Sequence, residues 1–260
     1  MRLPTTSLAG RFFVFAGLVL GLATIASGAE TLRLRADMWM PYNGDPESKT
    51  PGYVVELAKA IFEPQGIKVD YQMMPWAEAL TNARSGKIDG VIGAGSAELE
   101  GLIAPDESIG EPRVVLLVKK DSPWKFENVT SLKGVRLGAI EGYTYWEALD
   151  AYIKAGKAPA VVQFGGETPL VDGLNQLKEG KIDVMPETMA VFVWTVKGMG
   201  LSPSDFRIAY TWQNEPIYLA FSKNDKGARY AKMFDEGMGK MRASGALAAL
   251  LKRYGLAEWK

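Results

Sequence analysis

Short β-rich runs alternate along the chain with amphipathic segments of helical period. Residues 32–36 and 67–71 are typical of strands, while the apolar residues of 54–62 recur at helical spacing in a helix that ends at 64–66. A second helix opens at Pro75, a residue that suits a first turn because its missing N–H costs nothing there. This alternation predicts an α/β fold with largely parallel sheets.

A four-residue motif occurs twice, each time after a helix-like segment and before a buried strand. The sequence Gly-Lys-Ile-Asp occupies positions 86–89 and 180–183. Each copy supplies a glycine that ends a helix, a turn and a strand, so the repeat predicts two similar α/β lobes. We expect Asp89 and Asp183 to be structural residues that help to set the turn between helix and strand.

The second lobe is predicted to be inserted into the first. Continuous apolar runs at 114–118 and 217–221 mark the two places where the chain passes between lobes. We therefore assign residues 30–115 and 219–260 to lobe 1 and residues 116–218 to lobe 2. A chain that crosses twice between lobes has a geometry that permits hinge bending.

The first 29 residues have the pattern of a cleavable export signal. Arg2 and Arg11 precede an apolar run over 12–26, and the small residues of 27–29 suit cleavage. The apolar run is shorter than the roughly 20 residues that a membrane-spanning helix needs. We therefore expect cleavage near Ala29 and a mature chain in a bacterial periplasm.

The composition is that of an ordinary globular protein, and it excludes several kinds of chemistry. Thirty Lys and Arg balance thirty Asp and Glu, so we expect no basic surface and no nucleic-acid partner. The chain has no His and no Cys, which excludes Ser-His-Asp and thiol catalysis, most zinc and iron sites, and disulfides. We predict no cofactor and no metal, and any chemistry must use carboxylates, Lys, Tyr or Ser.

The loops after the predicted strands of the first lobe contain groups suited to a polar ligand, because ligands of open α/β sheets bind beyond the carboxyl ends of strands. Trp39 and Tyr42 offer flat walls, and Trp76 offers a third. Gly95 and Ser96 offer N–H donors and a hydroxyl suited to a carboxylate. The three aromatic residues could instead pack in the core, and Ser96 could instead cap a helix.

The second lobe offers a matching set. Tyr143 and Thr144 precede a predicted helix, so their N–H groups and the Thr144 hydroxyl could bind the ligand from the opposite side. Glu187 could accept a charge-assisted hydrogen bond from a ligand cation. The alternatives are that Thr144 caps the helix and that Glu187 only begins the helix at Thr188.

Seven short motifs in this order resemble the periplasmic solute-binding proteins of polar amino acid ABC transporters. The resemblance covers residues 30–260 and implies a type II periplasmic-binding fold, with two Rossmann-like lobes that close on a small polar solute. It also implies a monomer that serves a membrane permease, and it places Glu187 near an acidic position that contacts the ligand ammonium. The motifs are Trp39-Met40-Pro41-Tyr42, Gly52-Tyr53, Pro75-Trp76, both Gly-Lys-Ile-Asp copies, Gly142-Tyr143-Thr144-Tyr145, and Ser244-Gly245 before Tyr254-Gly255.

One stretch departs from the family pattern. The family usually carries an Arg that binds the amino acid carboxylate, whereas residues 97–101 read Ala-Glu-Leu-Glu-Gly. This puts an ordinary α-amino acid in doubt. We expect Glu98 and Glu100 to be solvated, but acidic side chains that point inward, with Glu141 and Glu187 also candidates, would favour a cationic or amine-rich ligand.

Two other functions use a similar fold. A ligand-sensing module of a membrane receptor would need a separate signalling partner. An enzyme similar to cyclohexadienyl dehydratases would need an acid, such as Glu187 or Glu141, and basic residues for two substrate carboxylates. Because residues 97–101 contain no Arg, we expect a binding protein that serves an ABC importer and not an enzyme.

Overall fold

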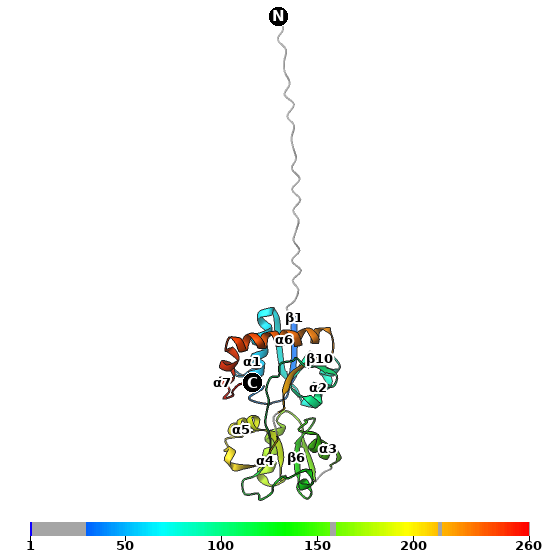
Figure 1. Ribbon diagram of the computed structural model, residues 1–260, viewed down its shortest axis with the longest axis vertical. Coiled ribbons are helices and arrows are strands. Elements are labelled where there is room, and N and C mark those ends of the chain that lie inside the picture. Colours follow the sequence, from blue (N-terminus) through cyan, green and yellow to red (C-terminus); the bar gives the residue numbers. More distant parts are fainter. Residues whose placement is uncertain (2–29, 157–159, 213–214, 260) are drawn as a thin grey trace.

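The computed structural model describes Met1 and residues 30–156, 160–212 and 215–259, and the predicted export signal, Met1 apart, lies outside these residues. The chain forms two lobes, one above the other in Figure 1. The N-terminal and C-terminal segments build the upper lobe together, and the middle of the chain builds the lower lobe. None of the helices in the described ranges has the length and apolar character to cross a membrane.

Lobe 1 is built on a five-stranded sheet with the order β2-β1-β3-β10-β4. Strands β2, β1 and β3 are parallel, while β10 returns antiparallel between β3 and β4. The elements of this lobe are β1 (Glu30–Ala36), α1 (Tyr53–Phe62), β2 (Ile67–Met73), α2 (Trp76–Arg84), β3 (Gly90–Gly95), β4 (Leu102–Ile103), β10 (Ile217–Ser222), α6 (Asp225–Ala243) and α7 (Ala246–Arg253), with short 3-10 turns at Glu63–Gln65 and Ser96–Glu98.

Lobe 2 repeats this arrangement. Strands β8, β5 and β9 form one sheet and β6 and β7 another, and a bridge between Leu137 and Val184 joins them into the order β7-β6-β8-β5-β9. The predicted α/β architecture with two similar lobes is confirmed. The elements are β5 (Val114–Lys119), β6 (Leu137–Ile140), α3 (Glu147–Ala155), β7 (Val161–Phe164), α4 (Pro169–Glu179), β8 (Met185–Thr188), α5 (Met189–Gly198) and β9 (Phe206–Thr211), with 3-10 turns at Val129–Leu132 and Pro203–Asp205.

Helices cover both faces of the lobe 1 sheet because successive strand residues point to opposite sides. On β10, Leu219 and Phe221 belong to the large core under α1, α6 and α7, whereas Ala220 belongs to the separate core under α2. Met238 of α6 is fully buried in the large core. The sheet therefore sits between two apolar layers, and only its ends are free to form a site.

The two Gly-Lys-Ile-Asp copies have the same structural role. Asp89 accepts three hydrogen bonds from Arg33, one from the backbone N–H and two from the guanidinium. Asp183 accepts the corresponding three bonds from Arg136. In each lobe the aspartate thus ties the turn before one strand to the neighbouring parallel strand. The prediction that both aspartates are structural is confirmed.

The chain passes between the lobes twice, between β4 and β5 and between β9 and β10. Val114 and Val115 already pair with strands of lobe 2, and Ile217 already pairs with Gly95 of lobe 1. The boundaries expected after residue 115 and before residue 219 fall inside β5 and β10. Each apolar run continues without a break through the point where the chain passes from one lobe to the other. Hydropathy alone therefore does not locate the boundary between the lobes.

Candidate functional site

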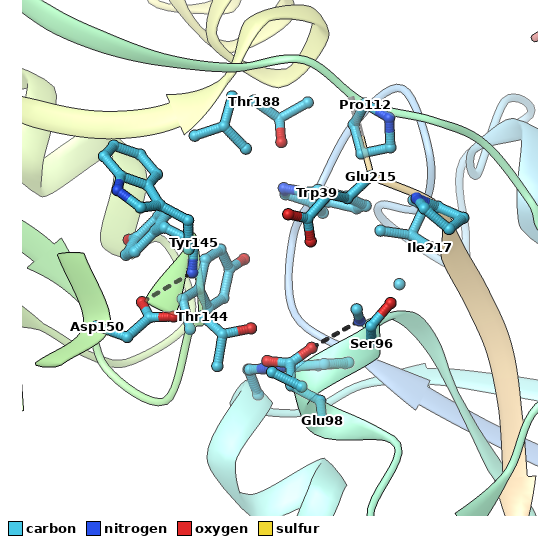
Figure 2. A pocket seen from close by; sticks show the side chains of 18 of the residues that line it. Trp39, Ser96, Glu98, Pro112, Thr144, Tyr145, Asp150, Thr188, Glu215 and Ile217 are labelled. Carbon is cyan, nitrogen blue, oxygen red and sulfur yellow. Dashed lines mark hydrogen bonds between the residues drawn. The ribbon is translucent and has the colours of Figure 1, made fainter. Parts of the chain in front are cut away.

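A cavity of about 540 Å³ lies between the two lobes. It opens beyond the carboxyl ends of β1, β3, β6 and β8, where the loops of both sheets face each other. Figure 2 shows Trp39, Ser96 and Ile217 of lobe 1 on one side of this space and Thr144 and Asp150 of lobe 2 on the other. We call this cavity the cleft.

Aromatic side chains form much of the wall. Trp39 is half-buried, and its ring stacks on Tyr42 with centroids 4.2 Å apart. Gly93, at φ 103°, lets this indole approach β3 closely, since a Cβ there would lie 3.2 Å from the ring. From the opposite side of the cleft, Tyr143 meets Trp76 edge-on with centroids 6.4 Å apart. Such electron-rich faces suit apolar groups and organic cations.

Tyr42 does not have the position that we expected. Its ring is 5% exposed, packs between Trp39 and Tyr53 and does not line the cleft. The expectation of a cleft wall is therefore corrected to a supporting role behind Trp39. The loop after β1 turns between Trp39 and Tyr42, so the Trp39 ring faces the cleft and the Tyr42 ring lies behind it.

Every charged side chain that lines the cleft within the described residues is acidic. No Lys or Arg lines it: Arg84 donates to the backbone carbonyls of Glu98 and Glu100, and Arg113 lines a different hollow. Lobe 1 and lobe 2 both contribute acids. The six acidic residues are Asp37, Glu98, Glu147, Asp150, Glu187 and Glu215.

Glu187 is the most enclosed of these acids. One carboxylate oxygen, Oε1, accepts from the backbone N–H of Thr188 at 2.6 Å and from Trp39 Nε1 at 3.4 Å. The other, Oε2, is buried and has no partner among the described residues. Burial raises the pKa of Glu187 to about 8. An orphaned buried acceptor in a cleft is expected where a ligand donates a hydrogen bond.

Asp37 links the two lobes. Its Oδ2 accepts from the Tyr143 hydroxyl at 2.7 Å, and the residue is only 5% exposed. Burial raises the pKa of Asp37 to about 7, against the opposing effect of the Tyr143 hydrogen bond. The Asp37 carboxylate also raises the pKa of Glu187, and the Glu98 carboxylate raises the pKa of Asp37. A bound cation would relieve both effects by supplying the missing positive charge.

Glu98 is buried, so the expectation that it is solvated is wrong. Its carboxylate accepts from the backbone N–H of Gly95 and from Trp76 Nε1, both at 2.9 Å, and the Thr144 hydroxyl also hydrogen-bonds to it. Burial raises its pKa, although these three hydrogen bonds oppose the rise. The short 3-10 turn Ser96–Glu98 directs the Glu98 side chain back into the cleft. The pattern of polar and apolar residues along the chain does not predict this change of direction.

The other expected acids lie elsewhere. Glu100 and Glu141 are exposed and do not line the cleft. The expected carboxylate-binding donors are also corrected, since the Gly95 N–H and the Thr144 hydroxyl are used by Glu98. Seven of the eight predicted site residues nevertheless line the cleft, and their contact with a ligand stays a prediction. These seven are Trp39, Trp76, Gly95, Ser96, Tyr143, Thr144 and Glu187.

Sequence reasoning did not select several residues of the cleft. Asp37 directly follows a predicted strand, and this position was the signal that could have identified it. Asp150 accepts from the backbone N–H of Tyr145 at 2.9 Å and reaches the cleft from α3. Glu215 and Ile217 enter from the second crossing, which no local pattern connects to the cleft. Within the described ranges, no three acidic side chains are grouped so that they could hold a metal ion.

Comparisons with known proteins identify the family of this chain and its fold. Residues 35–257 match the model of the bacterial extracellular solute-binding proteins, family 3. A probable amino-acid-binding protein of Bacillus subtilis (strain 168), YxeM, is 21% identical over 218 residues, which cover 82% of this chain and 79% of that protein.

Two solved structures show the same fold. An ancestral arginine-binding protein bound to arginine superposes with a TM-score of 0.71 at 22% identity, covering 86% of this chain and 97% of that one. A histidine kinase sensor domain with similarity to periplasmic binding proteins superposes with a TM-score of 0.70 at 20% identity, covering 88% and 98%. At these identities the structures establish the fold alone.

Proposed function

The chain belongs to family 3 of the bacterial extracellular solute-binding proteins, and we propose that its cleft captures a small solute with a positively charged amine or guanidinium group. The solute-binding role follows from the family. The positive charge of the solute is what we propose in addition. The observation that carries it is a cleft lined by acids from both lobes and, among the described residues, by no Lys or Arg.

The contacts of these acids support a cation. Glu187 Oε2 is a buried acceptor without a donor, and Asp37 receives one hydrogen bond from the opposite lobe. Leaving two carboxylates desolvated without a cation is unfavourable, as their raised pKa values show. An ammonium or guanidinium between them would supply hydrogen-bond donors and charge, while Trp39 and Tyr143 would enclose its apolar part.

Ligand binding would favour lobe closure. The hydrogen bonds from Tyr143 to Asp37 and from Trp39 to Glu187 run between the lobes, so both of these acids already contact the opposite lobe. In an open form these bonds would be broken and the acids hydrated. A solute that bridges both lobes shifts the population toward the closed form by its differential affinity for the two forms. We place the hinge at the two crossings, between β4 and β5 and between β9 and β10.

The setting of this activity is also proposed. We expect export through the signal in residues 1–29, a monomeric mature protein, and delivery of the solute to the membrane permease of an ABC importer. The absence of Lys and Arg from the described part of the cleft disfavours an enzyme that acts on dianionic acids. A sensory role would use the same cleft and would leave solute uptake unchanged in a strain that lacks the protein.

The test is a thermal-shift screen of the exported protein against cationic, zwitterionic and anionic solutes of similar size. A cation at about 100 times its Kd stabilises the folded state by roughly 2.7 kcal/mol, which raises the unfolding midpoint by several degrees. Stabilisation by cations and not by anions supports the proposal. Stabilisation by anions alone, or by no small solute, contradicts it.

A further inference from the structure

Three hydrogen-bond donors converge on one point at the bottom of the cleft. The backbone N–H of Gly95 and Trp76 Nε1 each donate at 2.9 Å, and the Thr144 hydroxyl donates from the other lobe. Figure 2 shows this point between Ser96 and Thr144. Converging N–H and O–H donors at a strand end form a site for an anion.

The chain's own carboxylate occupies this anion site. Glu98 is 6% exposed, and its two oxygens receive Trp76 Nε1 and the Gly95 N–H of lobe 1, while the carboxylate also receives the Thr144 hydroxyl of lobe 2. An indole and a backbone amide each have a single N–H, so neither has a second one to offer. A ligand carboxylate would therefore find the two donors in use and a buried acid in its place.

The remainder of the cleft offers a ligand anion the Ser96 hydroxyl but, among the described residues, no Lys or Arg side chain. Arg84, the guanidinium nearest in sequence, is held by the backbone carbonyls of Glu98 and Glu100 and does not line the cleft. Asp37 and Glu187 present acceptors. Most polar side chains of the cleft are thus hydrogen-bond acceptors. They suit a ligand that presents donor groups much better than one that presents acceptor groups.

From this arrangement, and resting on the proposed function, we infer that Glu98 replaces the carboxylate of an amino acid ligand. The cleft then admits organic cations that lack a carboxylate, such as amines and guanidines of the size of decarboxylated amino acids. Glu98 is the residue that sets this specificity. Amino acids that carry the same cationic group are rejected because their carboxylate would meet Glu98.

Matched pairs of compounds test the inference by isothermal titration calorimetry on the exported protein. Each pair differs only by the carboxylate: agmatine and arginine, cadaverine and lysine, putrescine and ornithine, histamine and histidine. We expect the amine of at least one pair to bind at least about 100-fold more tightly than its amino acid, the effect of one charged group left opposite a like charge. An amino acid that binds as tightly as its amine overturns the inference.

Substitution of Glu98 tests the cause of this preference. Glu98→Ala frees the donors of Gly95, Trp76 and Thr144, so the amino acid of the pair should gain affinity while the amine loses it. Glu98→Gln keeps the size of the side chain but removes its charge, and the preference should fall by at least about ten-fold. Glu100→Gln is the matched control, because this exposed acid lies two residues away outside the cleft.

The outcomes separate the two proposals. If an amino acid binds the wild-type protein as tightly as its paired amine does, the cationic solute-binding function stands and the role of Glu98 fails. If no member of any pair binds, the proposed function fails, and the inference fails with it. If the amines bind but both Glu98 variants keep the full preference, the specificity lies elsewhere and the role of Glu98 is wrong. Circular dichroism and the unfolding midpoint of each variant show that it is folded.

Discussion

The paired aspartates of the repeat and the unpaired carboxylates of the cleft occupy different ends of the same two sheets. Asp89 precedes β3 and Asp183 precedes β8, whereas Asp37 follows β1 and Glu187 lies near the end of β8. All four are carboxyl groups at or next to the ends of sheet strands. They differ in what faces them.

The pKa values record this difference. Burial opposes the ionisation of Asp89, but hydrogen bonds from Arg33 and Lys226 outweigh it and lower the pKa. The Arg136 hydrogen bonds likewise lower the pKa of Asp183. In the cleft, burial has no cation to oppose it, and the pKa values of Asp37 and Glu187 rise. The aspartates of the repeat thus stabilise each lobe. The carboxylates of the cleft remain available to bind a ligand cation.

Among the variants, Glu187→Gln is expected to have the largest effect on ligand affinity. The substitution removes a buried charge that faces the bound cation, so the affinity for a cationic solute should fall about 100-fold. The ligand-free protein should be at least as stable as the wild type, because an amide is less costly to bury than an unpaired carboxylate. Calorimetry and urea unfolding measure the two quantities.

Glu141→Gln provides the comparison for this variant. It makes the same chemical change on the same lobe, at an exposed residue that does not line the cleft. Its affinity should equal that of the wild type. A loss of affinity in both variants, or a loss of stability without a loss of affinity in Glu187→Gln, would show that Glu187 serves the fold and not the ligand.

Asp89→Ala should have the opposite pattern. The variant leaves the backbone N–H of Arg33 without its partner and breaks ion pairs to Arg33 and Lys226, which should lower the free energy of unfolding by about 2 kcal/mol. The affinity should remain within about two-fold of the wild type. Urea unfolding and calorimetry are the measurements.

Asp183→Ala tests whether the two copies are equivalent. The Asp183 side chain is 37% exposed, compared with 8% for Asp89, so water screens its ion pair more strongly. We expect a smaller loss of stability in the same direction. An equal or larger loss, or a loss of affinity in either variant, would contradict the assignment of both aspartates to the scaffold.

The dependence on pH separates the two sets of carboxylates without a substitution. Asp37 and Glu187 have folded-state pKa values of about 7 and about 8, well above their ordinary values, so the folded protein retains protons that the unfolded chain has released. Stability that is present below about pH 4 is therefore lost as the pH rises toward about pH 8. Bound cations favour the ionised forms, so affinity should increase about ten-fold from about pH 6 to about pH 8.

Calorimetry in two buffers with different ionisation enthalpies measures the protons released on binding. Glu187→Gln should reduce the release, while Asp89→Ala should not, because the pKa of Asp89 lies below this pH range. Binding that is independent of pH, with no proton release, would mean that both cleft acids are already ionised in the free protein.

The smallest of these effects is expected from Trp39→Ala. Loss of the indole face should weaken the binding of a cationic solute about five-fold, with little change in stability, since Trp39 is half-buried at the cleft. Trp194→Ala is the control, because Trp194 is 39% exposed on α5 and does not line the cleft. A steep fall in the unfolding midpoint with unchanged affinity would identify Trp39 as a core residue.

Local sequence patterns predicted most of the elements and the division into two lobes. Hydrophobic period and helix-ending glycines are properties of neighbouring residues, so α1 and β2 agree closely with their expected ranges. The Gly-Lys-Ile-Asp repeat likewise predicted two structural aspartates, because its context is the same in each lobe. The lobe boundaries expected at the crossings were less accurate, since they depend on which sheet each strand joins.

The sequence by itself determined the elements, the two lobes and a set of residues near the strand ends. Only the tertiary structure decided which of these residues face the cleft. Trp39 and Glu187 are 148 positions apart, and Tyr143 and Asp37 are 106 apart, yet each pair is joined by a hydrogen bond. Glu98 is buried because Trp76, 22 positions earlier, and Gly95 donate to it. Burial and pKa are set by such distant neighbours, and a local pattern carries no information about them.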